Sequence, residues 1–224
     1  MEIRPYMKMI PKMFEFARSE FGDEPEFLHD IHELLPPIEA INLVKELEQY
    51  RPFFIEDPFA PEDNGYFKML REQTSCAIAM GELFNNPHEW VNLITERLID
   101  FIRIHISQIG VITPAIKVAR LAEFFNVRTA WHGPGNTSPV GHAGNAHIDL
   151  SIWNFGIQEQ TDLKEETLEV FPGIPTIKNG YMHINDAPGF SIDINEELAA
   201  KYPLPEEPWY RRTLRRPDGT VVRP

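Results

Sequence analysis

The sequence predicts an α/β protein with a parallel sheet that is either doubly wound or closed into a barrel. Short apolar runs alternate with amphipathic stretches over most of its 224 residues, and repeated strand–helix units imply parallel strands. Three consecutive predicted strands end in an acidic residue at equal intervals, as expected for the repeating unit of a barrel. No glycine-rich dinucleotide fingerprint and no phosphate loop occurs.

The predicted elements follow one another in a regular order. An amphipathic stretch over residues 10–21 comes first. Apolar residues at helical spacing, such as Ile41 and Val44, predict a helix over 37–50 that begins at Pro37. The same criteria predict strands over 26–31, 52–57, 76–82, 99–106, 127–133 and 154–159, and helices over 62–73, 87–98, 113–126 and 139–152.

The pattern changes after about residue 160. Turn-forming residues dominate there, followed by a short helix capped by Asn195 and by a basic, turn-rich tail. We therefore expect two parts, residues 1–202 with the strand–helix units and a C-terminal extension over 203–224. In so acidic a chain, the tail is better interpreted as a docked extension than as a nucleic-acid-binding arm.

Composition excludes several classes of protein. The net charge of −13 argues against nucleic acid or an anionic membrane as the main partner. The single cysteine, Cys76, rules out an internal disulfide framework and fits a reducing compartment. No apolar run approaches the length of a membrane span, and the first residues lack the apolar core of a signal peptide. We expect a soluble cytoplasmic protein.

The acidic strand ends are Asp30, Glu56 and Glu82, each 26 residues after the previous one. This spacing predicts that the three carboxylates lie at the same height on adjacent parallel strands, at the face where barrels carry their active sites. Converging carboxylates repel one another, and an all-oxygen set without cysteine favours Mg²⁺ as the ion that they bind. The alternative is that each acid caps the next helix or pairs with a lysine.

Three later strand ends continue this face. Arg103 is expected either to bind a substrate carboxylate through two hydrogen bonds or to form ion pairs with the three acids as their outer-shell partner. His132, with Gly133 beside it, is a candidate contact to a substrate hydroxyl. Glu159 either binds a sugar hydroxyl or orients His132. If the first strand continued, His32 would share the side of Asp30, which makes it a candidate general acid or base.

Seven segments carry a resemblance to a known family. They are "LHDIHELLPPIEA", "FFIEDPFAPED", "AMGELFNNPHEW", "IDFIRIHISQIGVITP", "WHGPGNTSPVGHAGNAHIDL", "NFGIQE" and "NDAPGFSIDINEELAAKYP". From about residue 7 to about residue 203 the chain resembles the mannonate dehydratase group of the enolase superfamily. This group includes D-gluconate dehydratases and starvation-sensing relatives.

The resemblance implies an incomplete enolase-type (β/α)7β TIM-like barrel and a Mg²⁺-dependent hydro-lyase. Its substrate would be a sugar acid, D-mannonate or D-gluconate. A proton leaves the carbon beside the carboxylate, hydroxide leaves the next carbon, and the metal stabilises the enediolate. By resemblance, His32 is the acid–base residue. The other positions are the metal ligands Asp30, Glu56 and Glu82, and the substrate contacts Glu82, Arg103, His132, Asn136 and Glu159.

The chain departs from the family pattern in two places. Asn136 stands where the family motif has a substrate-contacting aspartate, so substrate preference or affinity is expected to differ. The family's N-terminal capping domain and first barrel strands, with their tyrosine base, are absent, so we expect a fragment or a product completed by a partner. The resemblance also implies a homo-oligomer for the full-length form.

Three functional interpretations therefore remain open. The first is the catalytic part of a D-mannonate dehydratase-like enzyme, with D-gluconate dehydratase as its variant. The second is a non-catalytic protein that binds a sugar acid for regulation. The third is a fragment without activity of its own.

Overall fold

The computed structural model describes residues 3–203 and residue 219, and it contains a five-stranded parallel sheet. The strands lie side by side in chain order, without the reversal that marks a doubly wound sheet. They are β1 (His29–Asp30), β2 (Ile55–Glu56), β3 (Ile78–Met80), β4 (Phe101–Ile102) and β5 (Arg128–Thr129). Of the two architectures that the sequence predicts, the structure shows part of a barrel.

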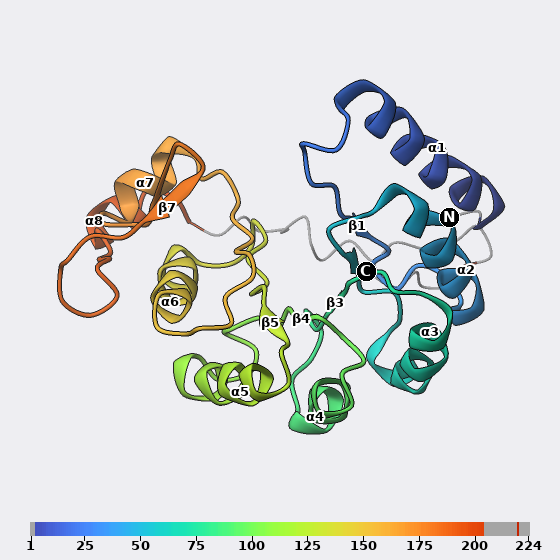
Figure 1. Ribbon diagram of the computed structural model, residues 1–224. Coiled ribbons are helices and arrows are strands. Elements are labelled where there is room, and N and C mark those ends of the chain that lie inside the picture. Colours follow the sequence, from blue (N-terminus) through green and yellow to red (C-terminus); the bar gives the residue numbers. More distant parts are fainter. Residues whose placement is uncertain (1–2, 204–218, 220–224) are drawn as a thin grey trace.

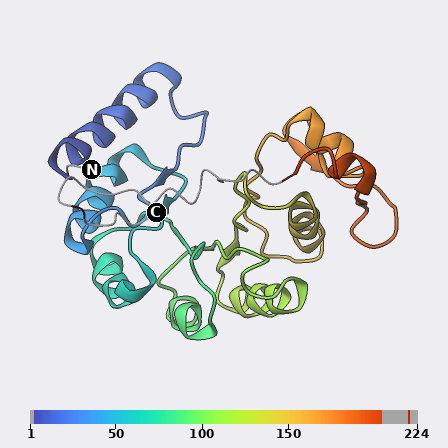
Figure 2. The same ribbon diagram turned by 180° about the vertical axis from the view of Figure 1, so that it is seen from behind.

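Helices cover the outer side of this sheet in an open arc (Figure 1). The same arc is seen from behind in Figure 2. The helices of this arc are α1 (Ile3–Phe21), α2 (Pro37–Leu47), α3 (Phe67–Gln73), α4 (Pro87–Thr95), α5 (Ile112–Phe124) and α6 (Pro139–Asp149), with 3₁₀ turns η1 (Glu48–Tyr50) and η2 (Pro61–Tyr66). Each helix follows a strand except α1, which precedes β1. This is an incomplete (β/α) barrel, as predicted.

Local sequence explains where these helices begin. Pro36 and Pro37 open α2, and its buried face includes Ile41 and Val44. The α4 helix begins with a capping box, in which Asn86 and Glu89 satisfy each other's backbone amides. These helices bury their apolar faces against the sheet in one large core. A smaller apolar cluster consists of Phe54, Ala79, Phe101 and Ala130.

Two predicted boundaries differ from the structure. The first helix begins at Ile3 rather than at residue 10, and Pro5 in its first turn is compatible with this earlier start. The predicted strand over 154–159 is reduced to one parallel bridge between Phe155 and Thr129. The close approach to β5 depends on Gly156, because a Cβ there would lie 2.8 Å from the Thr129 carbonyl oxygen.

The C-terminal part lies beyond α6, at one end of the arc (Figure 1). It consists of α7 (Glu165–Val170), an antiparallel hairpin of β6 (Thr176–Lys178) and β7 (Tyr181–His183), and α8 (Glu196–Ala199). The turn Asn179–Gly180 has φ angles of 52° and 78°, and an Asn-Gly pair of this kind predicts a tight hairpin. The sequence pattern predicts only turns over this segment, so the hairpin is an addition to that prediction.

The predicted C-terminal extension over 203–224 lies outside the described residues, apart from positions 203 and 219. Within the described part of the chain, no helix combines the length and the apolar character needed to cross a bilayer.

Candidate active site

The C-terminal ends of the strands surround a pocket of about 370 Å³. Seven of the eight predicted site residues line it: Asp30, His32, Glu56, Glu82, Arg103, His132 and Glu159. The eighth, Asn136, is exposed on the turn after His132 and is not among the lining residues. The sequence therefore identified most of the polar lining of this pocket.

One side of the pocket, which we call the acidic wall, consists of Asp30, Glu56 and Glu82. Asp30 and Glu56 are partners in the β1–β2 register, so the predicted equal height is confirmed for this pair. It is wrong for Glu82, because Glu56 is paired with Ala79 and Glu82 lies three residues further along. The repeat between the second and third strands is thus shorter than the first repeat.

Glu82 nevertheless faces the pocket because the backbone turns sharply before it. Gly81 has a φ of +137°, a conformation that residues with a side chain rarely adopt. The turn is closed by the Phe84 amide, which donates to the Gly81 carbonyl at 3.0 Å. Glu82 then lies with Oε1 3.4 Å from His32 Nε2 and Oε2 3.2 Å from His132 Nε2.

Burial makes ionisation of the acidic wall unfavourable. Burial raises the pKa of Asp30 and of Glu82, although His32 acts in the opposite direction on both. It raises the pKa of Glu56 to about 8, and the neighbouring Arg103 only partly offsets this effect. A bound cation would favour the ionised form of all three carboxyls.

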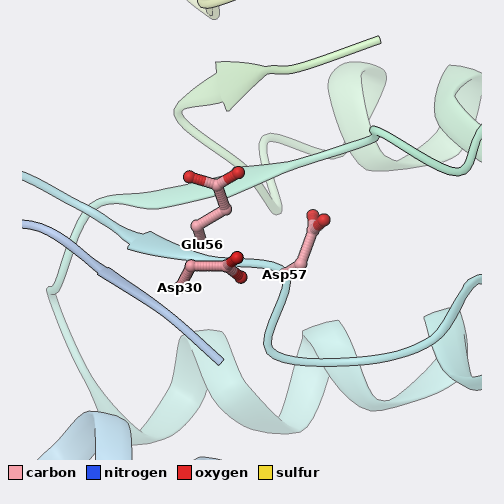
Figure 3. Close-up of side chains that lie close together, drawn as sticks. All are labelled: Asp30, Glu56 and Asp57. Atoms are coloured by element: carbon pink, nitrogen blue, oxygen red, sulfur yellow. The ribbon is translucent and has the colours of Figure 1, made fainter. Parts of the chain in front are cut away.

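Asp57 is a fourth acid at this place, and the sequence analysis did not select it. Single oxygens of Asp30, Glu56 and Asp57 lie within 4.8 Å of one another. Figure 3 shows these three side chains close together. Asp57 is fully buried and is not among the residues that line the pocket. Burial raises its pKa well above the ordinary value. The consecutive acids at 56 and 57, just before Pro58, were the available sequence signal.

The opposite side, which we call the mixed wall, consists of Arg103, His132 and Glu159. Arg103 Nε lies 2.5 Å from Glu56 Oε1, and its Nη2 donates to Glu159 Oε2 at 2.9 Å. Glu159 Oε2 also accepts the Gly133 amide at 2.8 Å. A Cβ at Gly133 would lie 2.3 Å from the Glu159 carbonyl oxygen, so this contact requires glycine. Despite burial, the Gly133 amide and Arg103 lower the pKa of Glu159.

The pKa values of the two histidines of the site shift in opposite directions. Burial lowers the pKa of His132 to about 4, so its imidazole is neutral near pH 7. Burial also opposes protonation of His32, but Asp30, Glu82 and Glu33 together raise its pKa. His29, which precedes Asp30 in β1, contacts α1, where the Tyr6 hydroxyl lies 2.7 Å from its Nε2.

His105 is a second residue that the sequence analysis did not select. Its ring lies 5.2 Å from the His132 ring in a T-shaped arrangement. Its Nδ1 lies 2.8 Å from the Ser107 hydroxyl and its Nε2 lies 3.1 Å from the Thr137 hydroxyl. Alternation along the fourth strand, two residues after Arg103, was the signal that could have identified it.

Comparison with known proteins gives a consistent result. A family profile described as "Enolase C-terminal domain-like" matches residues 4–198. The chain is 53% identical over 219 residues to "D-galactonate dehydratase family member RspA" of Pantoea ananatis (strain LMG 20103), covering 98% of this chain and 52% of that protein. This chain therefore spans about half the length of the curated relatives that it matches.

Two solved structures are similar over nearly the whole chain. An enolase from Pantoea ananatis with bound D-gluconate and Mg has a TM-score of 0.94 and 53% identity, covering 100% of this chain and 54% of that one. A putative galactarate dehydratase from Agrobacterium radiobacter, with bound Na and L-malate, has a TM-score of 0.86 and 25% identity. That match covers 99% of this chain and 59% of the other.

Proposed function

The chain belongs to the enolase C-terminal domain-like family, and we propose that it forms the metal-binding part of a Mg²⁺-dependent sugar-acid dehydratase. The observation that carries this proposal is the pocket in which an acidic wall faces a mixed wall at the C-terminal ends of the strands. In barrels of this architecture, that face is where substrates bind and react.

The acidic wall fits a hard divalent cation. Asp30, Glu56 and Glu82 are the residues that would hold Mg²⁺, since they supply only oxygen ligands from three neighbouring strands. Their carboxyl groups are also the ones whose charged form burial disfavours and a cation would favour. When bound, Mg²⁺ would stabilise negative charge that develops on the substrate carboxylate.

His32 is the residue that would move a proton. It lines the pocket beside Glu82, and the acids around it favour its protonated form. A protonated His32 can give its proton to the departing hydroxyl group, as the family resemblance implies. His132 stays neutral and lines the opposite wall, where it can bind a substrate hydroxyl together with Glu159.

The sequence leaves two roles open for Arg103, binding a substrate carboxylate or pairing with the acids. Its contacts in the structure favour the second. Its Nε, Nη1 and Nη2 atoms face Glu56, the Ala130 carbonyl and Glu159 respectively. Because all three nitrogens already have protein partners and the side chain is buried, we assign Arg103 to holding the two glutamates rather than to clamping a substrate carboxylate.

D-gluconate is the sugar acid that we propose as substrate. The similar structure from Pantoea ananatis carries D-gluconate and Mg, whereas the names of the relatives point to D-galactonate and none of those given above mentions mannonate. D-mannonate, which the sequence resemblance implied, and D-galactonate are therefore the comparison substrates.

The test is dehydration of these three acids in the presence of Mg²⁺ by the chain combined with the part of the Pantoea ananatis relative that it does not cover, with the 2-keto-3-deoxy acid as measured product. We expect product from D-gluconate that depends on Mg²⁺ and disappears in His32→Asn. Binding of D-gluconate without any product would contradict the proposed reaction and favour a sugar-acid-binding protein.

A further inference from the structure

We infer that Asp57 is a positioning residue that fixes the turn presenting Glu82 to the metal. This inference rests on the proposed metal site, and it assigns to Asp57 a role that differs from that of a ligand. It explains why a fully buried acid follows directly after Glu56.

Asp57 links the ends of three neighbouring strands. Its amide donates to the Ala79 carbonyl at 3.0 Å, and its carbonyl accepts the Glu33 amide at 3.0 Å. Its side chain adds a third link, because Oδ1 accepts the Gly81 amide at 3.1 Å. These strand ends are the segments that carry the three residues of the acidic wall.

The side-chain link acts on a turn with an unusual backbone conformation. Gly81 stands at φ +137°, and the next residue is Glu82, which the regular strand register does not bring to the height of Glu56. Because Asp57 Oδ1 accepts a hydrogen bond from the Gly81 amide, it holds this turn in place. Asp57 itself has a φ of +39°, a conformation that aspartate and asparagine tolerate better than most residues.

The position of Asp57 argues against a direct contact with a bound ion. Although one of its oxygens lies near those of Asp30 and Glu56, the side chain is fully buried and is not among the residues lining the pocket. Oδ1 already accepts a hydrogen bond from the protein backbone, and Oδ2, which has no hydrogen-bond partner among the described residues, is buried as well. Glu82, by contrast, lines the pocket.

The experiment is calorimetric titration of the folded chain with Mg²⁺, comparing Asp57→Ala, Asp57→Asn and Gly81→Ala with the wild type. Residues that orient metal ligands typically change affinity by about 10–100-fold when they are removed. We expect Asp57→Ala to weaken Mg²⁺ binding by that factor, because no acceptor remains for the Gly81 amide. Asp57→Asn keeps an oxygen acceptor and should bind nearly as the wild type does.

Val44→Ala and Gly81→Ala separate positioning from general stability. Val44→Ala, in the core of α2, should lower the melting temperature without changing Mg²⁺ affinity. Gly81→Ala disturbs the same turn from the other side, since its Cβ would lie 3.1 Å from Phe84 Cδ2, and it should weaken Mg²⁺ binding like Asp57→Ala. It tests the inference even if Asp57→Ala does not fold.

The outcomes distinguish this inference from the proposed function. Wild-type affinity in Asp57→Ala or in Gly81→Ala overturns the positioning role while leaving the metal site intact. Equal weakening in Asp57→Asn and Asp57→Ala overturns it as well, because a metal ligand would behave in that way. A wild-type chain that binds no Mg²⁺ contradicts the proposed site and, with it, this inference.

Discussion

The two walls of the pocket both contain glutamates, yet their pKa values shift in opposite directions. On the acidic wall, burial raises the pKa of Glu56 to about 8 despite the nearby Arg103. On the mixed wall, the Gly133 amide and Arg103 outweigh burial and lower the pKa of Glu159. The first cause of the difference is burial, because 6% of the Glu56 side chain is exposed and 36% of the Glu159 side chain is exposed. The second is the hydrogen bonds that Glu159 accepts from the Gly133 amide and Arg103.

This comparison indicates what each wall can bind. The negative charge of Glu159 is already balanced by protein donors, so the mixed wall can offer hydrogen bonds to a neutral hydroxyl group. The acidic wall brings Asp30, Glu56 and Glu82 together, with Arg103 of the mixed wall in contact with Glu56. Its carboxyl groups outnumber this cation, and a bound divalent ion would favour their ionised form.

The largest expected effect is that of replacing His32, because this substitution should impair proton transfer and leave metal binding unchanged. We expect His32→Asn to lower the rate of D-gluconate dehydration by about 10²–10⁴-fold, the usual contribution of a positioned acid or base. Its Mg²⁺ affinity should stay close to that of the wild type, and exposed His88→Asn should change neither quantity. Unchanged turnover in His32→Asn would remove this histidine from the reaction.

The next effect tests the link between the two walls. Arg103→Met leaves Glu56 buried without its cation, and loss of one partner from a buried ion pair typically costs about 3–5 kcal/mol. We expect a loss of this size in urea unfolding of the metal-free protein at pH 9, above the pKa of about 8 at which Glu56 ionises in the wild type. Arg128→Met, on the exposed face of the next strand, is the matched control. Equal stability of both variants would show that Arg103 does not hold the walls together.

A smaller effect concerns Asp149, a partly buried acid outside both walls. Burial raises the pKa of Asp149 to about 8, with the Trp131 indole acting in the opposite direction. Between the ordinary value of 3.8 and this value, the folded state binds more protons than the unfolded state, so stability falls as pH rises. We expect the drop in melting temperature from pH 5 to pH 8 to be smaller in Asp149→Asn than in the wild type.

The control for this pH measurement is Asp186→Asn, which changes an exposed acid. It should show the same pH dependence as the wild type. If Asp149→Asn also shows the wild-type dependence, other groups such as the acids of the pocket must be responsible for it.

The smallest effect is expected at Asn136, which is exposed and lies outside the pocket lining. Asn136→Asp should change stability by less than about 0.5 kcal/mol, as most surface substitutions do. The preference for D-gluconate over D-mannonate should change little. A strong change in preference, measured with both acids, would mean that the turn carrying Asn136 contacts the substrate.

The sequence predicted the architecture well where strands and helices repeat. The alternation of apolar runs and amphipathic stretches identified all five strands of the sheet and α2 to α6, with boundaries displaced by a few residues. It could not distinguish the predicted strand over 154–159 from a single bridge, because pairing depends on a neighbouring strand and not on local pattern. The Asn179–Gly180 hairpin carried a local signal that the analysis did not use.

The site was predicted less completely, and the reason is geometric. Equal spacing placed Asp30 and Glu56 correctly, but it could not reveal that Glu82 stands three residues beyond the register and depends on the turn at Gly81. Asp57 was missed because strand alternation assigns it to the opposite side from Glu56. Only the three-dimensional structure shows that its carboxyl group reaches the Gly81 amide.

The measurement that tests the central claim most directly is thermal unfolding with and without Mg²⁺, in the wild type and in Glu56→Gln. At a Mg²⁺ concentration of about 100 times Kd, binding to the folded state alone adds about 2.7 kcal/mol. For a chain of this size, that corresponds to a rise of about 5–10 °C in the melting temperature. We predict this rise in the wild type and not in Glu56→Gln. No rise in the wild type, or an equal rise in both proteins, would contradict a metal site on the acidic wall.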